Sequence, residues 1–501
     1  MSGVDRRSMI AGGLALTALP AVAQTRLASP HRRWTGAVDR GVHRFLGIRY
    51  GTAERFRAPR PYLPKTTEAA TAFGPSCPQS STIAPTSEDC LFLNVWTAEP
   101  DAAPQKPVMV YIHGGAYSNG SVTDPLNDGY ALATRGDVVV VTVNHRLNAL
   151  GYLYLARIDP RFPDSGNAGQ LDLILALKWV RDNIANFGGD PRNVTVFGQS
   201  GGGAKIATLM GMPAAKGLLH RAATMSGQQV TASGPLNATA RAKAFLAKLG
   251  GGDVATVPVA RLIDALKAID PILGGGVYMG PVLDMTWLTR HPFWPDPHPI
   301  SNAIPLMLGN TSRETGAFID PDGPKVKGLD WTNLADRMAS EVRIDLPPEW
   351  IVAQYRRQFP TWSPMEVFYN ATTAGRSWPG QVIEADARAK AGVPAWVYQV
   401  DFASRTDPRR GAYHTIDIPL VFGTIDKPES QTGTGADARA ASKAMQDAFV
   451  TFAKTGVAPW PRHDLKTRAT MIFDVRSRVE NDPRKFQREL FARAPYIQPG
   501  S

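Results

Sequence analysis

Cysteine is scarce in this 501-residue chain, which holds only Cys77 and Cys90. No cluster of histidines accompanies them, so we expect no metal site. The residues between them form a short stretch rich in serine, threonine and proline. In an oxidising compartment we therefore expect a disulfide between the two, and closing so short a loop contributes about 3 kcal/mol to stability.

Long apolar runs and nucleic-acid motifs are also missing. Beyond the N-terminal segment, no stretch approaches the roughly 18 consecutive apolar residues of a membrane span, so we expect no stable membrane insertion. No basic run is interleaved with aromatic residues, which argues against a nucleic-acid partner. The net charge of +11 is typical of a solubilising surface, and the alternative is a mild preference for anionic surfaces or substrates.

The N-terminus of the chain has a pattern typical of an export signal. Arg6 and Arg7 precede a short apolar segment, 11–19, and residues 20–23 end in an A-x-A cleavage pattern. Residues 1–23 therefore predict a removable signal of the twin-arginine type, with an ordinary secretory signal as the alternative. We expect residues 24–501 to form one folded domain that is periplasmic or secreted.

Buried strands and a helical segment follow one another in the first half of the chain. Residues 108–112 and 138–143 are nearly continuous apolar runs, which suit strands buried on both faces of a parallel sheet. Residues 171–184 have apolar side chains at helical spacing, so the order is typical of an α/β fold with a central, mostly parallel sheet flanked by helices. Further strands are expected within 34–50, 91–96, 193–197, 222–225, 304–308 and 395–400.

The strand predicted at 193–197 leads directly into the pattern G-x-S-x-G at 198–202, and a helix is expected from Ala204. A serine on such a turn is held in a strained backbone, with its hydroxyl exposed near the positive end of the helix. Glycine-rich turns that contain serine are common. Between a strand and a helix, however, the pattern predicts that Ser200 is a nucleophile.

A serine hydroxyl needs a base, and the base needs a third group to fix its tautomer. In this type of sheet the acid and then the histidine follow the serine along the chain. Glu314 follows the strand that ends at Leu308, and His414 lies in a loop after a later predicted strand. Spacing alone leaves two alternatives open, because Glu314 could pair with Arg313 and because Asp417 is a rival acid.

The loop H-G-G-A-Y at 113–117 directly follows another predicted strand. Its small residues allow backbone N–H groups to approach a substrate, as the stabilisation of an oxyanion requires. We assign the donors to Gly115, Ala116 and Gly201. The alternative is a plain glycine turn.

Taken together, these segments resemble the type-B carboxylesterase and lipase family of the α/β-hydrolase fold, which includes the cholinesterases. The resemblance implies that Glu314 is the acid of a triad with Ser200 and His414, and that the hydroxyl of Ser226 supports this triad. The segments that match in family order are SEDCLFLNVW (87–96), HGGAY (113–117), VNHRLNALGY (143–152), GNAGQLD (166–172), FGGDP (187–191), MSG (225–227) and GPVLD (280–284), with the elbow and the Glu314 and His414 segments.

The resemblance also implies structural pairs. These are an ion pair of Arg146 with Asp172, an ion pair of Arg55 with Glu88, and the Cys77–Cys90 bridge.

The chain departs from the family pattern on both sides of the serine. The family usually has glutamate before the serine and alanine after it, whereas this chain has Gln199 and Gly201. Gln199 removes a buried charge near the site, and Gly201 keeps the N–H group while loosening the backbone. The loop between the cysteines contains no tryptophan, so we expect no aromatic cation-binding loop and no specialist for choline esters.

These residues predict a serine carboxylic-ester hydrolase that forms an acyl-enzyme, acts on small-molecule esters and needs no metal or organic cofactor. A lipase, amidase or thioesterase with the same triad is one alternative, and a non-catalytic binding protein of the same fold is the other. The region 325–390 predicts helical insertions over the catalytic face, and the polar tail from Asp482 onward is interpreted as a simple terminus. No feature of the sequence indicates an oligomeric state.

Overall fold

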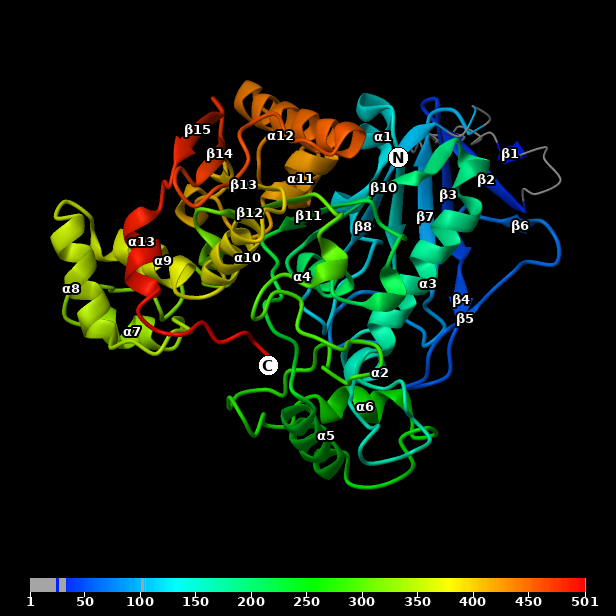
Figure 1. Cartoon of the computed structure of the whole chain (residues 1–501), viewed down its shortest axis with the longest axis horizontal. Coiled ribbons are helices and arrows are strands. Elements are labelled where there is room, and N and C mark those ends of the chain that lie inside the picture. Colours follow the sequence, from blue (N-terminus) through cyan, green and yellow to red (C-terminus); the bar gives the residue numbers. More distant parts are fainter. Residues whose placement is uncertain (1–23, 27–32, 101–102, 104, 501) are drawn as a thin grey trace, which may run out of the picture.

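One large sheet crosses the molecule in the computed structural model, which describes residues 24–26, 33–100, 103 and 105–500. Its strands lie in the order β1-β2-β3-β7-β9-β8-β10-β11-β12-β13-β14-β15, and β6 pairs with β2. Figure 1 shows this sheet passing from the blue N-terminal strands on the right to the red β15 on the left. The predicted signal segment, residues 1–23, lies outside the described residues.

The centre of the sheet positions the site, because its strands pair in parallel and their carboxyl ends open at one edge. These strands are β9 (Val139–Val143), β8 (Lys106–Ile112), β10 (Gly189–Gln199), β11 (Arg221–Met225), β12 (Leu306–Thr311), β13 (Ala395–Val400) and β14 (Ala469–Phe473). The predicted α/β fold with a mostly parallel central sheet is therefore confirmed.

Antiparallel strands extend both edges of this centre. On one side lie β1 (Gln24–Arg26), β2 (Trp34–Asp39), β3 (Val42–Arg49) and β7 (Phe92–Thr97), and on the other lies β15 (Arg478–Asn481). The short β6 (Glu68–Ala69) pairs with β2 in parallel. The short strands β4 (Gly51–Thr52) and β5 (Arg60–Pro61) form a small separate sheet.

Helices cover both faces of the sheet because alternate strand residues are apolar on each side. Along β8, Val108 and Val110 belong to one buried cluster, whereas Met109 and Tyr111 belong to another. The first cluster includes side chains of α2 (Asn148–Tyr152), α3 (Ala168–Asn183), α4 (Gly201–Leu209), α5 (Pro235–Leu249) and α6 (Val259–Ala265). The second includes those of α1 (Tyr130–Gly136), α11 (Asp417–Phe422) and α12 (Ala436–Thr455).

A further group of helices has its own buried cluster, which includes Ile351, Tyr355 and Phe368. Figure 1 shows most of these helices in yellow at the left, with the red α13 beside them. The helical insertions predicted within 325–390 are therefore confirmed. They are α7 (Leu334–Ala339), α8 (Pro348–Gln358), α9 (Pro364–Ala374) and α10 (Trp378–Lys390), and α13 (Lys485–Phe491) joins them from the C-terminal region.

The C-terminal tail is not a simple terminus, so that prediction is wrong. After α13 the tail runs back toward the centre of the molecule (Figure 1). Gln498 Oε1 accepts a hydrogen bond from the N–H of Val230 at 3.0 Å, and the carbonyl of Gly500 accepts one from Arg241 at 2.8 Å. Backbone and amide contacts of this kind leave no apolar periodicity in the sequence, which is why the pattern did not reveal them.

The two ion pairs implied by the resemblance are present. Arg146 Nη2 lies 2.6 Å from Asp172 Oδ1 with both side chains buried, and Arg55 Nη2 lies 2.6 Å from Glu88 Oε1. The buried pair of Arg146 with Asp172 links the segment after β9 to helix α3, which packs against one face of the sheet.

The predicted disulfide is not formed in the structure, where Cys77 and Cys90 are buried free thiols. Cys77 Sγ accepts a hydrogen bond from the N–H of Leu147 at 3.2 Å. Contact with Cys77 and burial raise the pKa of the Cys90 thiol well above its usual value. The two thiols nevertheless lie side by side in the core, as a pair of reduced cysteines.

Candidate active site

The predicted catalytic residues follow the carboxyl ends of neighbouring parallel strands. β8 leads into the loop 113–117, β10 into Ser200 and β11 into Ser226. β12 leads into Glu314, and β13 into the loop that contains His414. Adjacent strands thus bring together residues that are far apart in the sequence.

Ser200 occupies a strained turn between β10 and α4. Its φ of 55° and ψ of −124° lie in a region that residues with side chains rarely adopt, which is the strain expected of a serine on such a turn. Its N–H donates to the carbonyl of Met225 at 2.7 Å.

Glycines surround the serine because there is no room for a Cβ. A Cβ on Gly202 would lie 2.0 Å from the carbonyl oxygen of Ile112, and one on Gly201 would lie 2.0 Å from that of Ala116. The close approach of Ala116 is the physical reason for Gly201 at a position where the family usually has alanine.

A chain of hydrogen bonds runs from Ser200 through His414 to Glu314. His414 Nε2 lies 2.7 Å from Ser200 Oγ, and His414 Nδ1 hydrogen-bonds to Glu314 Oε2. The other oxygen of Glu314 accepts bonds from Ser226 Oγ at 2.7 Å, from the N–H of Thr311 at 2.7 Å and from the side chain of Asn310 at 3.1 Å. Ser226 therefore contacts the carboxylate, as the resemblance implies.

The surroundings of Glu314 keep its carboxyl group charged. Burial alone would raise the pKa of Glu314, but the positive charge and hydrogen bond of His414, with the bonds from Ser226 and Thr311, lower it below the usual value. A buried carboxylate that accepts this many hydrogen bonds keeps its negative charge and can stabilise an imidazolium beside it.

Two alternatives were open: Glu314 could pair with Arg313, or Asp417 could be the acid. The structure contains neither an ion pair of Arg313 with Glu314 nor a hydrogen bond of Asp417 with His414. The guanidinium of Arg313 stacks over the ring of Tyr369, 3.7 Å from its centroid, instead of pairing with Glu314. Asp417 is buried, and no described group hydrogen-bonds to its carboxyl oxygens. Burial and the charge of Glu314 raise the pKa of Asp417 well above its usual value, so its carboxyl group ionises less readily than that of Glu314.

Gln199 holds the histidine loop by a bond that the usual glutamate could not make. Its Nε2 donates to the backbone carbonyl of His414 at 2.6 Å. An ionised carboxylate is only an acceptor, so the exchange of glutamate for glutamine replaces a charge with a positioning contact.

The loop after β8 presents backbone N–H groups to the same space. Gly115 and Ala116 have φ values of 85° and 53°, and in the part of the chain that the structure describes neither N–H donates to a protein acceptor. Gly201 is the first residue of α4, where backbone N–H groups lack intrahelical partners. The predicted oxyanion donors therefore border one cavity together with Ser200 and His414.

A buried cation that sequence analysis missed lies behind this loop. Lys205 on α4 is fully buried, and its Nζ donates to the carbonyl of Ala116 at 2.7 Å and to that of His113 at 3.4 Å. Burial lowers the pKa of Lys205 to about 7. The signal was present in the sequence as a lysine within a helix of small and apolar residues, AKIATLM (204–210).

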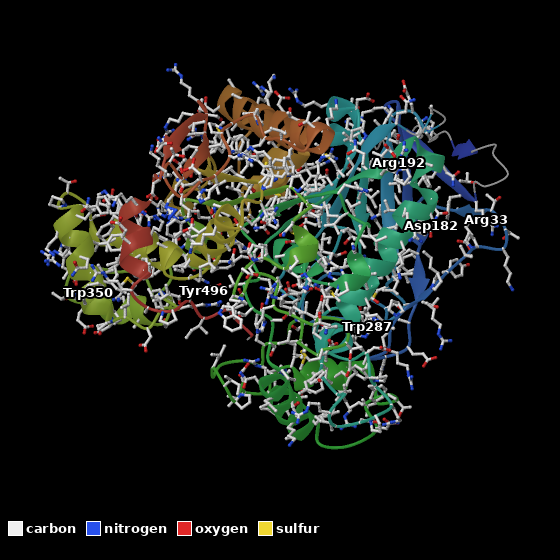
Figure 2. The ribbon with its side chains drawn as sticks, viewed as in Figure 1. Arg33, Asp182, Arg192, Trp287, Trp350 and Tyr496 are labelled. Carbon is white, nitrogen blue, oxygen red and sulfur yellow. The ribbon has the colours of Figure 1, made fainter. Side chains whose placement is uncertain are left out.

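The cavity has a volume of about 520 Å³, and segments far from the sheet complete its wall. These segments contribute Tyr278, Phe318, two arginines at 343 and 376, and Tyr496, Gln498 and Pro499 of the tail. Figure 2 shows Tyr496 between the helical insertion and the middle of the molecule. The tail is thus part of the site.

Clusters of metal ligands and membrane-spanning helices are both absent from the described residues. These residues contain no group of three or more His, Cys, Asp or Glu placed to hold a metal ion. Their helices are also too short or too polar for any of them to cross a membrane.

The sheet, the strained serine and its hydrogen-bonded histidine define a serine hydrolase of the α/β-hydrolase fold. Residues 32–470 match the Carboxylesterase family, and the chain belongs to this family of carboxylesterases.

Individual relatives cover nearly the whole chain. The para-nitrobenzyl esterase of Bacillus subtilis (strain 168) is 35% identical over 489 residues, which are 91% of this chain and 96% of that protein. The fumonisin B1 esterase of Sphingopyxis macrogoltabida is 31% identical over 90% of this chain and 88% of its own length. The crystal structure of a Geobacillus stearothermophilus carboxylesterase matches with a TM-score of 0.81 and 33% identity, over 93% of this chain and 99% of that chain.

Proposed function

We propose that the protein hydrolyses carboxylic esters of small molecules through an acyl-enzyme on Ser200, with His414 as the base and Glu314 as the triad acid. The observation that supports this most strongly is the unbroken hydrogen-bond chain from Ser200 Oγ through both ring nitrogens of His414 to Glu314. The reaction uses protein groups and water alone.

In the first half-reaction, His414 Nε2 takes the proton of Ser200 as its oxygen attacks the ester carbonyl. The backbone N–H groups of Gly115, Ala116 and Gly201 stabilise the negative charge that develops on the carbonyl oxygen. The imidazolium, held by the carboxylate of Glu314, then gives its proton to the departing alkoxide, and the acyl group remains on Ser200.

In the second half-reaction, water takes the place of the alcohol. His414 removes a proton from this water, which attacks the acyl carbonyl. The same donors hold the second oxyanion, and the collapse of the intermediate returns the proton to Ser200 and releases the acid.

Hydrolysis of p-nitrophenyl esters from acetate to palmitate, on wild-type protein and Ser200→Ala, tests this proposal. We expect rapid turnover of the shorter esters, and a fall in kcat of about a million-fold in the variant, as for serine nucleophiles elsewhere. An equally slow reaction of both proteins at every chain length would contradict the role of Ser200.

The same triad serves lipases, amidases and thioesterases, so the bond that is cleaved has its own test. Matched ester, amide and thioester substrates with one acyl group separate these activities by their kcat/KM values. We expect the ester to be preferred over the amide, because an alkoxide leaves more readily than an amine. A higher kcat/KM for the amide would contradict ester hydrolysis as the main activity.

We also propose that the chain is exported by a twin-arginine-type signal at residues 1–23 and that Cys77 and Cys90 form a disulfide after export. The paired arginines and the A-x-A pattern support export. The adjacent positions of the two thiols support the disulfide.

A further inference from the structure

The wall of the catalytic cavity has an uneven distribution of charge. Of the described residues that line it, Arg343 and Arg376 carry a positive charge, and none is acidic. Glu314 lies behind His414 and is already bonded to it. A substrate in the cavity therefore faces two guanidinium groups and no exposed carboxylate.

Two neighbouring loops of the helical insertion hold these arginines. Arg343 lies between α7 and α8, and Arg376 lies between α9 and α10. The backbone N–H of Arg343 donates to the carbonyl of Gly375 at 2.7 Å, so the two loops are joined directly beside both side chains.

Aromatic contacts place Arg376 close to the catalytic histidine. Its guanidinium carbon lies 5.0 Å from the ring centroid of Phe318, and the ring of Phe318 lies 5.0 Å from that of His414. Arg343 lies near Tyr278 and Tyr496 of the cavity wall, since its charge lowers the pKa of both tyrosines against the larger effect of burial, which raises it.

Protein carboxylates balance the positive charge of this pair only in part. Glu341 pairs with Arg376 at 3.1 Å and also with Lys325, so one carboxylate serves two cations. In the described part of the chain, Arg343 has no acidic partner within ion-pair distance. Burial and the charge of Arg343 lower the pKa of Arg376 to about 10, so the two guanidinium groups are near enough to repel each other.

We propose that Arg343 and Arg376 form an anion subsite that binds a carboxylate on the substrate, so that the enzyme prefers esters bearing a negative group near the scissile bond. Guanidinium groups suit this role because their paired N–H donors match the two oxygens of a carboxylate. The subsite adds a substrate class to the ester hydrolysis proposed above and rests on it.

Matched pairs of substrates test the subsite on each half of the ester. On the alcohol half, 4-acetoxybenzoate is compared with methyl 4-acetoxybenzoate by release of the phenol. On the acyl half, monoethyl adipate is compared with ethyl heptanoate by release of ethanol. In at least one pair, we expect the wild-type protein to have the higher kcat/KM for the anionic member, and added salt to reduce this preference by screening the charges.

The variant Arg343→Gln is the main probe, because this side chain is exposed and has no structural ion pair to lose. We expect it to lower kcat/KM about tenfold for the preferred anionic substrate, mainly through KM, and less than twofold for the neutral partner. Arg376→Gln should act in the same direction, while Glu341 keeps Lys325 as its partner. Arg357→Gln is the control, since it removes an exposed charge from α8 that does not line the cavity.

Two outcomes would overturn the subsite. One is the absence of any preference for the anionic member in both substrate pairs. The other is an equal effect of Arg343→Gln on the anionic and neutral members. Hydrolysis of the neutral esters that is lost in Ser200→Ala would leave the proposed function standing in either case, so the two proposals fail separately.

Discussion

At the scale of the residue, Glu314 combines full burial with a retained charge. Four hydrogen bonds converge on its two oxygens, and only one of them comes from the residue that it serves. The remaining three hold the carboxylate in place when His414 is neutral. A fixed carboxylate selects the histidine tautomer that leaves Nε2 free to accept the proton of Ser200.

Replacing Glu314 with glutamine keeps the size and shape of the side chain and removes its negative charge. We expect Glu314→Gln to lower kcat by about three to four orders of magnitude with little change in KM, because the amide favours the wrong histidine tautomer and cannot stabilise an imidazolium. Steady-state kinetics with p-nitrophenyl butyrate measures this. Asp417→Asn is the matched control, and an effect as large as that of Glu314→Gln would assign the acid to Asp417 instead.

Lys205 links the oxyanion loop to the pH dependence of stability. Its pKa is lowered to about 7 in the folded protein, whereas a lysine in an unfolded chain titrates near 10.4. Between about pH 7 and pH 10 the unfolded chain therefore binds more protons than the folded one. In this window the group makes the free energy of unfolding rise with pH, by at most about 1.4 kcal/mol for each pH unit.

The substitution Lys205→Met removes this titration and the bond to the carbonyl of Ala116. We expect urea unfolding at pH 7 and pH 9 to show a smaller rise in stability than for wild type. We also expect kcat to fall about tenfold, because a charged hydrogen bond that positions the loop is lost. Lys178→Met, an exposed change on α3, is the control; an unchanged pH dependence in Lys205→Met would show that Lys205 does not titrate in this range.

At the scale of the element, the sequence predicted the strands and the turn whose signals lie within one short stretch of residues. Strands β8 and β9 are apolar on both faces, and the turn after β10 has a motif whose spacing reflects a steric requirement at Gly201 and Gly202. The order expected after such a motif, together with the resemblance to the family, pointed to Glu314 and His414, which form one hydrogen-bond chain with Ser200 in the structure. The fold class and its central strands were therefore accessible from the sequence.

The parts that were not predicted depend on contacts between distant segments. The tail docks through Gln498 and Gly500, and the cavity wall receives Arg343 and Arg376 from loops between helices. Polar residues in loops show no periodicity, and their partners are set by the packing of whole elements. The sequence therefore indicated helices over the site without indicating which side chains face the substrate.

The tail residue Tyr496 separates two cavities, which makes it a test of the tail as a functional element. It lines the catalytic cavity and also a second cavity of about 790 Å³. We expect Tyr496→Ala to join the two, and so to raise kcat/KM for p-nitrophenyl decanoate relative to acetate by about tenfold, since each additional buried methylene contributes about 0.8 kcal/mol.

The neighbouring exposed residue provides the control for this prediction. Ile497→Ala changes a side chain of the tail that lines neither cavity, and we expect the chain-length profile to stay as in wild type. If Tyr496→Ala left the profile unchanged as well, the tyrosine would not limit the length of the acyl chain.

At the scale of the whole molecule, the site is assembled from the sheet, the helical insertion and the tail. The sheet has a buried cluster on each face and the helical insertion has one of its own, and the catalytic cavity is lined by residues of all three parts. The positive charge of Arg343 and Arg376 in the cavity wall agrees in sign with the net charge of the chain, +11. An overall positive charge raises the rate at which anionic substrates arrive, and this effect weakens with salt.

Export and the proposed Cys77–Cys90 disulfide can be tested together, because a disulfide persists in an oxidising compartment and not in the cytoplasm. We expect protein recovered after export to have no reactive thiol when unfolded in the presence of Ellman's reagent, and protein lacking residues 1–23, made in the cytoplasm, to have two. The exported form should unfold with a free energy higher by about 3 kcal/mol, and reduction or Cys77→Ser should remove this difference.

Replacing Arg6 and Arg7 with lysine should retain the chain in the cytoplasm with both thiols reduced. Two free thiols in the exported protein would contradict the disulfide and leave the buried thiol pair of the structure as the functional form.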